Sequence, residues 1–470
     1  MKLLRPVLLL LFIALVFSCS DSGGLEGAEA SGGAIRNGVV FITIQGTYDL
    51  NKLLPEEFEG QTVTWQSSNT VLVTVDTDGI AKAVGINVNV DSPVSSGYGT
   101  GAVTVTATAG EESHTIKVTA TTEALVSIMD LEPIRKQFEN YFRMGNIFNP
   151  NDVAGGRVIN GRLTRHFNVL TAENNMKPGY ISTGRNSNNF TTANSMVNSA
   201  RSSGFRVVGH TLLWHSQNAG WMNSSVSLAD MRRYITSVVT EFKGRVQYWD
   251  VLNEVFPDSG KSGDWKTAMR TNNPWFASIG SSFVYEGFLA ARLADPNVIL
   301  YYNDFNTDNS TKATNIADMV RDVNLQYQTN LSAIKAANPT VNLNRTNLLI
   351  EGIGMQEHHN TGVTAAAIRA TLNKFSDLGV QVSVSELDVL AQSWGQYSAS
   401  APVTNRGLVD QARLYNEYMK VYLEYSSLID HVSIWGVTDN QSWRSRGLPL
   451  LFDSSGKAKP AYFGFVGALN

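Results

Sequence analysis

The chain has 470 residues and a formal net charge of −4, with 43% hydrophobic and 17% charged residues. A chain of this length can bury more than one hydrophobic core, so we expect two or three domains. The near-neutral balance offers no clustered basic surface and argues against a nucleic-acid partner. Aromatic residues make up 10% of the chain, a content that suits a large core and sugar-binding surfaces equally well.

The N-terminus carries a short apolar stretch, Val7–Phe17, preceded by two basic residues. It is too short to span a bilayer but has the length of a signal-peptide core. The stretch runs into Ser18 and Cys19, the only cysteine of the chain, so no intramolecular disulfide can form. The pattern resembles a bacterial lipobox, in which the cysteine becomes the acylated first residue after cleavage. An ordinary secretory signal with a chance cysteine is the alternative.

The lipobox pattern predicts a signal peptide over residues 1–18 and lipidation of Cys19. Acyl chains on Cys19 would hold a soluble protein on a membrane surface. We therefore expect a bacterial lipoprotein at the outer membrane, on the cell surface or on the periplasmic face. Residues 19–36 are small, polar and glycine-rich and are expected to form a flexible tether.

Residues 37–122 have a different pattern, in which short β-rich runs alternate with turn signals. Regular strand spacing without helical periodicity predicts a small all-β sandwich. The peptides Val63–Asn69 and Val73–Gly85 resemble a bacterial Ig-like domain of type 2, which implies a spacer or an adhesive module. The expected strands are 39–43, 62–66, 71–75, 80–84, 103–107 and 115–119.

Strand and helix patterns alternate from residue 123 to residue 470. Amphipathic stretches such as 229–242, 281–293 and 409–425 separate the strands. Eight successive β-then-α units predict an α/β fold, the (β/α)₈ barrel. Residues 307–345 are longer than a compact barrel needs and are expected to form an extra helix or a substrate-shaping loop. The expected barrel strands are 141–146, 167–173, 206–213, 246–253, 298–303, 348–356, 380–385 and 431–435.

Two glutamates come just past strands of this predicted barrel: Glu254 after the fourth and Glu386 after the seventh. Because the carboxyl ends of barrel strands meet on one face, both carboxylates should enter one cleft. Paired carboxylates in such a cleft are typical of enzymes that break glycosidic bonds. Four nearby histidines match no standard zinc spacing, so we expect neither a metal nor another cofactor. These histidines are His210, His215, His358 and His359.

Several strings at the strand ends closely resemble glycoside hydrolase family 10, the main family of endo-β-1,4-xylanases. The resemblance extends over about residues 125–470 and keeps the motifs in the family order. The segments that carry it are His166–Asn168, Thr171–Pro178, Gly209–Gln217, Trp249–Glu254, Tyr301–Asn306, Gly352–Gln356, Ser385–Asp388 and Lys459–Tyr462.

The resemblance implies a retaining double displacement, with the two carboxyl groups about 5 Å apart. By motif position, Glu386 is the nucleophile and Glu254 the acid/base. Elementary electrostatics agrees, because a negative Glu386 nearby favours a proton on Glu254. The implied substrate is xylan or arabinoxylan, cut at internal bonds by an enzyme that we expect to be monomeric.

The resemblance also assigns supporting roles. Asn253 would bind the sugar 2-hydroxyl, and Asp388 would orient His358 against the nucleophile. His215 would either brace the barrel or contact sugar. The residues expected to bind substrate are Glu173, Asn174, Lys177, His210, Trp214, Gln217, Asn253, Tyr302, Gln356, His358, Trp435 and Trp443. By the resemblance, the first six of these would hold the sugars on the non-reducing side of the cleaved bond.

Two departures from the family pattern and two rival functions stay open. The loop Gln217–Trp221 lacks the usual proline and is expected to sit differently, and Glu357–Asn360 is unusually polar. One rival is an endoglycosidase of the same fold that acts on β-glucan or cellulose. The other is a non-catalytic lipoprotein that only captures glycan, although such a binder would typically have lost one of the two glutamates.

Overall fold

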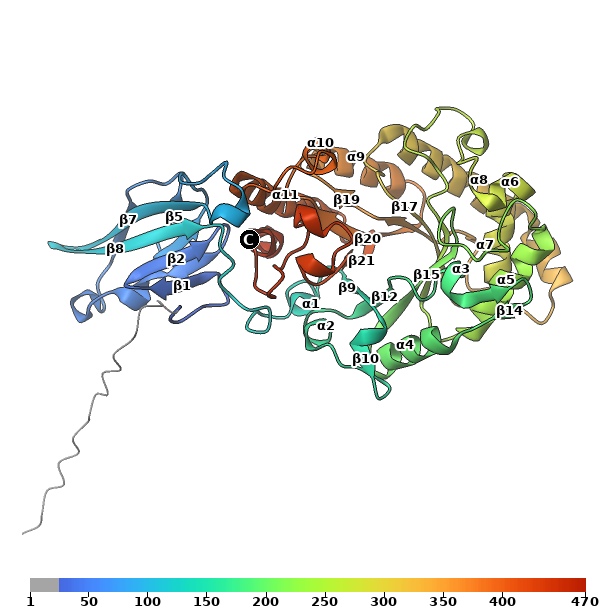
Figure 1. Cartoon of the computed structure of the whole chain (residues 1–470), viewed down its shortest axis with the longest axis horizontal. Coiled ribbons are helices and arrows are strands. Elements are labelled where there is room, and N and C mark those ends of the chain that lie inside the picture. Colours follow the sequence, from blue (N-terminus) through green and yellow to red (C-terminus); the bar gives the residue numbers. More distant parts are fainter. Residues whose placement is uncertain (1–24) are drawn as a thin grey trace, which may run out of the picture.

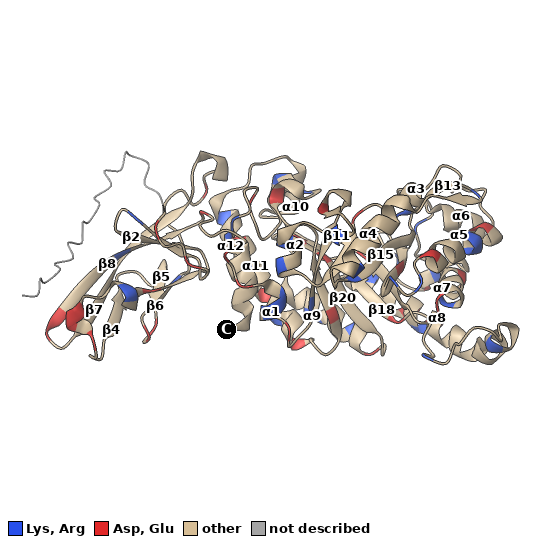
Figure 2. Ribbon diagram, turned by 90° about the horizontal axis from the view of Figure 1, so that it is seen from below, with Lys and Arg blue, Asp and Glu red and all other residues tan. Residues whose placement is uncertain are grey.

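The structure is a computed structural model that describes residues 25–470. They form two bodies that lie side by side, an N-terminal β-sandwich and a larger barrel (Figure 1). The signal peptide and the lipidated Cys19 expected from the sequence lie outside the described residues. Among residues 25–470, no helix is long and apolar enough to cross a membrane. Basic and acidic residues are scattered over both bodies (Figure 2), in keeping with the net charge of −4.

The sandwich consists of two sheets that enclose their own core. One sheet has the order β1-β2-β8-β7-β4 and the other the order β3-β6-β5. Every second residue of β7 points inward, as expected for a sheet with one buried face. The strands are β1 (Gly33–Arg36), β2 (Val39–Thr43), β3 (Thr47–Asp49), β4 (Thr64–Ser67), β5 (Val73–Val75), β6 (Ile80–Ala83), β7 (Thr100–Ala109) and β8 (Glu112–Thr121).

The expected tether is wrong in its last part, because residues 33–36 form strand β1 and pair antiparallel with β2. Two of the glycines that suggested flexibility, Gly32 and Gly33, serve close packing instead. A Cβ atom on Gly33 would lie 2.4 Å from the Tyr48 ring, and one on Gly32 would lie 2.8 Å from Phe463 of the barrel. Here the small residues allow the chain to pack closely against its neighbours. Composition alone does not distinguish such a segment from a flexible linker.

Eight parallel strands close into the expected (β/α)₈ barrel, since β18 pairs with β20 and β21 pairs with β9. All eight strands lie where the sequence predicts them, with shifted ends. They are almost wholly buried, as strands covered on both faces should be. They are β9 (Arg143–Phe148), β12 (Val169–Ala172), β15 (Arg206–Leu213), β16 (Tyr248–Asn253), β17 (Ile299–Asp304), β18 (Gly352–Met355), β20 (Gln381–Val389) and β21 (Ile429–Ile434).

Helices cover the outside of the barrel. The long segment 307–345 contains a single helix, α8, whose 28 residues start after the side-chain cap Asn309. Because α8 is the helix that connects β17 to β18, the expected extra helix is wrong, and the added length lies in the regular helix of this unit. The longer helices are α4 (Thr191–Ser202), α5 (Leu228–Glu241), α7 (Phe283–Ala294), α8 (Ser310–Ala337), α9 (Ala365–Ser376) and α11 (Asn405–Glu424). The shorter ones are α1 (Ile134–Gln137), α2 (Gly161–His166), α3 (Pro178–Ile181), α6 (Pro274–Ile279), α10 (Trp394–Ser398) and α12 (Pro460–Val466). Short strands outside the barrel ring are β10 (Val153–Ala154), β11 (Arg157–Val158), β13 (Ser182–Gly184), β14 (Ser187–Asn188) and β19 (His358–His359).

Candidate active site

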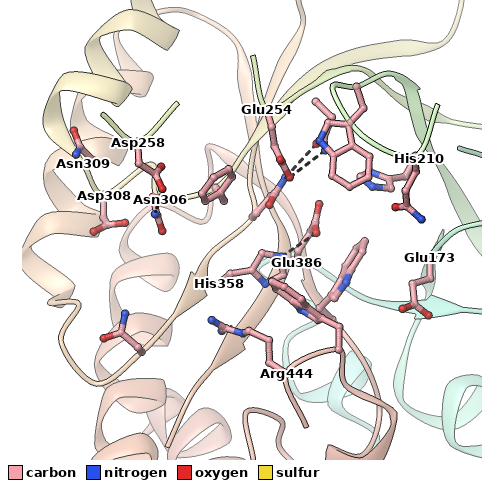
Figure 3. Close-up of a pocket in the computed structure, with 18 of the residues that line it drawn as sticks. Glu173, His210, Glu254, Asp258, Asn306, Asp308, Asn309, His358, Glu386 and Arg444 are labelled. Carbon is pink, nitrogen blue, oxygen red and sulfur yellow. Dashed lines mark hydrogen bonds and ion pairs between the residues drawn. The ribbon is translucent and has the colours of Figure 1, made fainter. Parts of the chain in front are cut away.

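A cleft of about 770 Å³ opens at the carboxyl ends of the barrel strands. Figure 3 shows Glu254 and Glu386 in its middle, with Glu173 and His210 on one side and Asn306 and Asn309 on the other. Thirteen residues predicted from the sequence line this cleft. They are Glu173, Asn174, Lys177, His210, Trp214, Gln217, Asn253, Glu254, Gln356, His358, Glu386, Trp435 and Trp443.

Glu386 lies inside strand β20 and not beyond its end, which corrects the expected position. Only 4% of the residue is exposed. Asn303 Nδ2 donates to its Oε1 at 2.7 Å, and His358 Nε2 lies 3.0 Å from its Oε2. Burial acts to raise the pKa of Glu386, but the His358 hydrogen bond and the nearby imidazoles outweigh it and lower that pKa below its ordinary value. The carboxylate is therefore ionised and fixed in direction.

His358 lies between two carboxylates. Its Nδ1 is 3.1 Å from Asp388 Oδ2, opposite the contact with Glu386. Burial opposes a charge here, yet Asp388 and Glu386 together raise the pKa of His358 to about 9. Asp388 is itself held by an ion pair with Arg444 and by a bond from Trp443 Nε1 at 3.1 Å. The imidazolium thus carries a positive charge against Glu386 at neutral pH.

Glu254 follows β16 in a left-handed backbone conformation with φ of 55°. Its backbone N–H donates to Asn303 O at 2.9 Å, which pins the turn to the next strand. Left-handed φ is uncommon outside glycine, and here the turn aims the side chain into the cleft. Gln356 Nε2 donates to Oε1 of Glu254 at 3.1 Å, and His215 Nδ1 lies 3.7 Å from its Oε2.

Two buried amides connect the carboxylates. Asn303 Nδ2 donates to Asn253 Oδ1 at 2.9 Å as well as to Glu386, and Asn253 Nδ2 donates to Glu254 Oε1 at 3.3 Å. Ser385 Oγ donates to Asn303 Oδ1 at 2.6 Å, which fixes the orientation of that amide. Asn303 and Ser385 were not predicted as site residues, although both lie in the quoted motifs.

One half of the cleft, which we call the Glu173 half, has the Lys177 side chain in contact with several of its other members. Its Nζ donates to Asn174 Oδ1 at 3.0 Å and to Gln217 Oε1 at 2.8 Å, and lies 5.0 Å from the centre of the Trp214 ring. Burial lowers the pKa of Lys177. His210 Nδ1 contacts Asp250 Oδ2 at 2.9 Å. The Glu173 half consists of Glu173, Asn174, Lys177, His210, Trp214 and Gln217.

The opposite half, the Asn306 half, was largely missed by the sequence reasoning. It comes from segments after β16, β17, β19 and β20, in which only Glu254 had been assigned a role. The asparagines at the end of β17 and after β19 are the sequence feature from which this half could have been predicted. The Asn306 half consists of Asp258, Phe305, Asn306, Asp308, Asn309, Asn360, Val363 and Trp394.

Three predicted residues do not line the cleft. Tyr302 is fully buried, donates to Asp304 and accepts from Val255 N at 3.1 Å, so the prediction that it binds substrate is wrong. Burial lowers the pKa of His215 to about 4, so a neutral imidazole backs Glu254. Asp388 lies behind His358 at the distance that a supporting role requires. Within residues 25–470, no group of three His, Cys, Asp or Glu side chains is arranged to hold a metal ion.

A barrel with two glutamates facing one polar, tryptophan-lined cleft defines the class of glycoside hydrolases. Residues 133–468 match the model of Glycosyl hydrolase family 10, and the chain belongs to this family. It is 31% identical to an endo-1,4-beta-xylanase of Geobacillus stearothermophilus over 71% of this chain and 97% of that protein. It is 30% identical to endo-1,4-beta-xylanase A of Thermotoga maritima over 75% of this chain.

The chain spans only 32% of the length of the Thermotoga maritima protein. The similarity to a solved structure is broader. A bacterial Ig-like domain containing family 10 xylanase from termite gut superposes with a TM-score of 0.83 and 46% identity. The match covers 91% of this chain and 97% of that one, so the combination of sandwich and barrel occurs in both.

Proposed function

We propose that the protein is a retaining endo-β-1,4-xylanase that hydrolyses internal bonds of xylan or arabinoxylan. The observation that carries the proposal is the fixed, ionised Glu386, bonded to Asn303 and His358 and facing Glu254 across the cleft. The names of its family 10 relatives support the substrate.

In the first step, Glu386 attacks the anomeric carbon while Glu254 gives its proton to the departing glycosidic oxygen. A covalent glycosyl-enzyme forms and the shortened chain leaves. Glycosylation removes the negative charge of Glu386, and Glu254, which has given up its proton, is left as a carboxylate facing a neutral ester. In the second step, Glu254 takes a proton from water, which attacks the anomeric carbon and releases the sugar with its original configuration.

The neighbours serve this sequence. Asn253 offers its amide to the sugar 2-hydroxyl, a contact that strengthens in the transition state. Gln356 is bonded to both Asn253 and Glu254, at 3.1 Å each, and holds the two side chains in one orientation. His358, kept cationic by Asp388, stabilises the charge of Glu386 before attack.

Substrate choice rests on the walls around the reacting ring. Xylose lacks the C5 hydroxymethyl group of glucose, and Lys177, Trp435 and Trp443 are placed to crowd that group. The test is reducing-sugar release from xylan, carboxymethylcellulose and mixed-linkage β-glucan, measured side by side. We expect xylan to be the preferred substrate and NMR to show the β-anomer first. Preference for a glucan would overturn the substrate, and no release from any polymer would favour a glycan-binding protein.

We also propose that the protein is a lipoprotein attached to the outer membrane through Cys19. The support is the apolar Val7–Phe17 stretch directly followed by Ser18 and Cys19. Replacing Cys19 by Ala should move the protein from the membrane fraction to the soluble fraction and abolish labelling with a fatty acid analogue. An unchanged membrane fraction would contradict the anchor. The proposed enzyme acts as a monomer, which light scattering of the protein lacking residues 1–24 would test.

A further inference from the structure

Helix α10 presents an aromatic ring to the cleft outside the groups used above. Of the nine tryptophans, only Trp394 and Trp443 are exposed, at 57% and 60%, and both line this cleft. Trp443 belongs to the group around Glu386 and His358, because its Nε1 donates a hydrogen bond to Asp388. Trp394 has no such connection. A large indole left in water at the edge of a polar cleft is suited to stack on the apolar face of a sugar ring.

Trp394 belongs to the Asn306 half of the cleft. The segment before α10 is bonded to the loop after β19, since Thr361 N donates to Gln392 O at 3.2 Å. That loop carries Asn360 and Val363, which line the same cleft. The Glu173 half comes instead from β15 and from the segments after β12 and β15. A chain that runs past Glu254 away from the Glu173 half therefore reaches Trp394.

Helix α10 is held in place by contacts of Tyr397 and by a capping box. The Tyr397 ring lies 5.7 Å from that of Trp394, and the Arg446 guanidinium lies 4.5 Å from the Tyr397 ring centre. Arg446 Nη2 also donates to Tyr397 O at 2.6 Å. A capping box between Ser393 and Gln396 closes the first turn. The indole is thus presented by a fixed helix, which reduces the entropy lost when a sugar binds.

The sandwich holds the segment that follows α10. Asn405 is fully buried between the two bodies. Its Nδ2 donates to Gly97 O at 2.9 Å, its Oδ1 accepts from Thr122 Oγ1 at 2.6 Å, and its backbone N–H donates to Ser92 O at 3.1 Å. Figure 1 shows the sandwich against α11, the helix that Asn405 begins.

Val94 of the sandwich packs against an apolar cluster that joins the two ends of the α10 segment. The cluster consists of Ala391, Val403 and Leu408. Ala391 comes just before α10, and Val403 comes just after it. The sandwich therefore contacts the end of this segment through the Asn405 amide, and it packs against the apolar cluster that joins the two ends of the segment.

We infer that Trp394 is a sugar-stacking platform for a xylose residue distant from the cleaved bond on the leaving-group side, and that the sandwich positions it. The inference rests on the proposed xylanase function and adds a specificity-determining residue to it. It also gives the sandwich a role in substrate binding that a spacer would not have.

The test compares a long substrate with one that cannot reach α10. For Trp394→Ala, we expect the ratio of kcat/KM for xylohexaose to kcat/KM for an aryl β-xylobioside to fall roughly 5- to 10-fold, the size of one aromatic stacking contact. Trp394→Phe should keep most of this ratio. Tyr141→Ala is the matched control, because Tyr141 is an aromatic residue, 44% exposed, before the amino end of β9.

The second arm tests the role of the sandwich. Asn405→Ala and, on the sandwich side, Val94→Ala should each lower the same ratio by roughly 2- to 3-fold. Adding either to Trp394→Ala should cause little further fall, since coupled residues are not additive. Thermal melting shows whether each variant is folded, and Val94→Ala leaves the barrel sequence intact. An unchanged ratio in Trp394→Ala would overturn the platform, and full additivity would overturn the positioning. Absence of wild-type activity on both substrates would instead refute the proposed xylanase function.

Discussion

The surroundings of Glu386 and Glu254 differ, although two amides join the carboxylates. Glu386 is 4% exposed and contacts the cationic His358. Glu254 is contacted by the neutral amides of Asn253 and Gln356 and by the neutral His215. A neighbouring cation fixes a negative charge, whereas neutral partners allow a proton to come and go. The contrast suits a nucleophile that stays ionised and an acid/base that changes state in each step.

The strongest test removes the fixed charge. Glu386→Ala should lower kcat on xylan and on aryl xylobiosides alike by roughly 10⁵-fold, because no covalent intermediate can form without the nucleophile. Added azide should restore turnover of the aryl substrate and give a glycosyl azide of inverted configuration. A product of retained configuration would contradict the assignment of Glu386.

The second test removes the exchangeable proton. Glu254→Gln should lower activity on xylan by roughly 10²- to 10⁴-fold, the usual size of general acid–base catalysis. On an aryl glycoside with a good leaving group, formation of the glycosyl-enzyme needs little acid help, so a pre-steady-state burst should survive. Equal loss of the burst and of xylan hydrolysis would remove the distinction between the two glutamates.

A smaller effect is expected from replacing His358, the cation that contacts Glu386. His358→Asn should lower kcat/KM by roughly 10- to 100-fold, the size seen when a supporting partner is lost. In the wild type His358 lowers the pKa of Glu386, so its loss should let that pKa rise. The acidic limb of the pH profile of kcat/KM should therefore move to higher pH. An acidic limb that does not move would show that His358 only orients the Glu386 side chain and does not stabilise its charge.

Most of the fold and the centre of the site could be predicted from the sequence because their signals are local. Barrel strands buried on both faces are continuous apolar runs, and the helices around them show 3.6-residue periodicity. The strand ends carry the polar motifs. Thus Glu254, Glu386 and the Glu173 half were all located from short peptides.

The errors arise where three-dimensional packing decides. Along β17, neighbouring side chains point to opposite faces of the barrel wall. Tyr301 belongs to a small core cluster with Val169, Val208 and Tyr248, and Tyr302 packs in the large core outside it. Asn303 reaches the site and Tyr302 does not, a difference that the motif does not show. The Asn306 half depends on how loops after several strands meet, for which the sequence holds no single pattern.

The last prediction concerns stability and uses the same cation. The pKa of His358 is raised to about 9, whereas an unfolded histidine titrates near 6.5. Between these values the folded protein binds more protons than the unfolded chain, so stability is full below pH 6.5 and is lost as pH rises through about 9. From pH 7 to 9 the wild type should lose about 2 kcal/mol from this group in urea unfolding. His358→Asn should show a correspondingly weaker pH dependence. Glu254→Gln changes a carboxylate of the same cleft that makes no hydrogen bond to His358, so it is the matched control and should keep the wild-type dependence. Parallel curves for wild type and His358→Asn would contradict a charged His358.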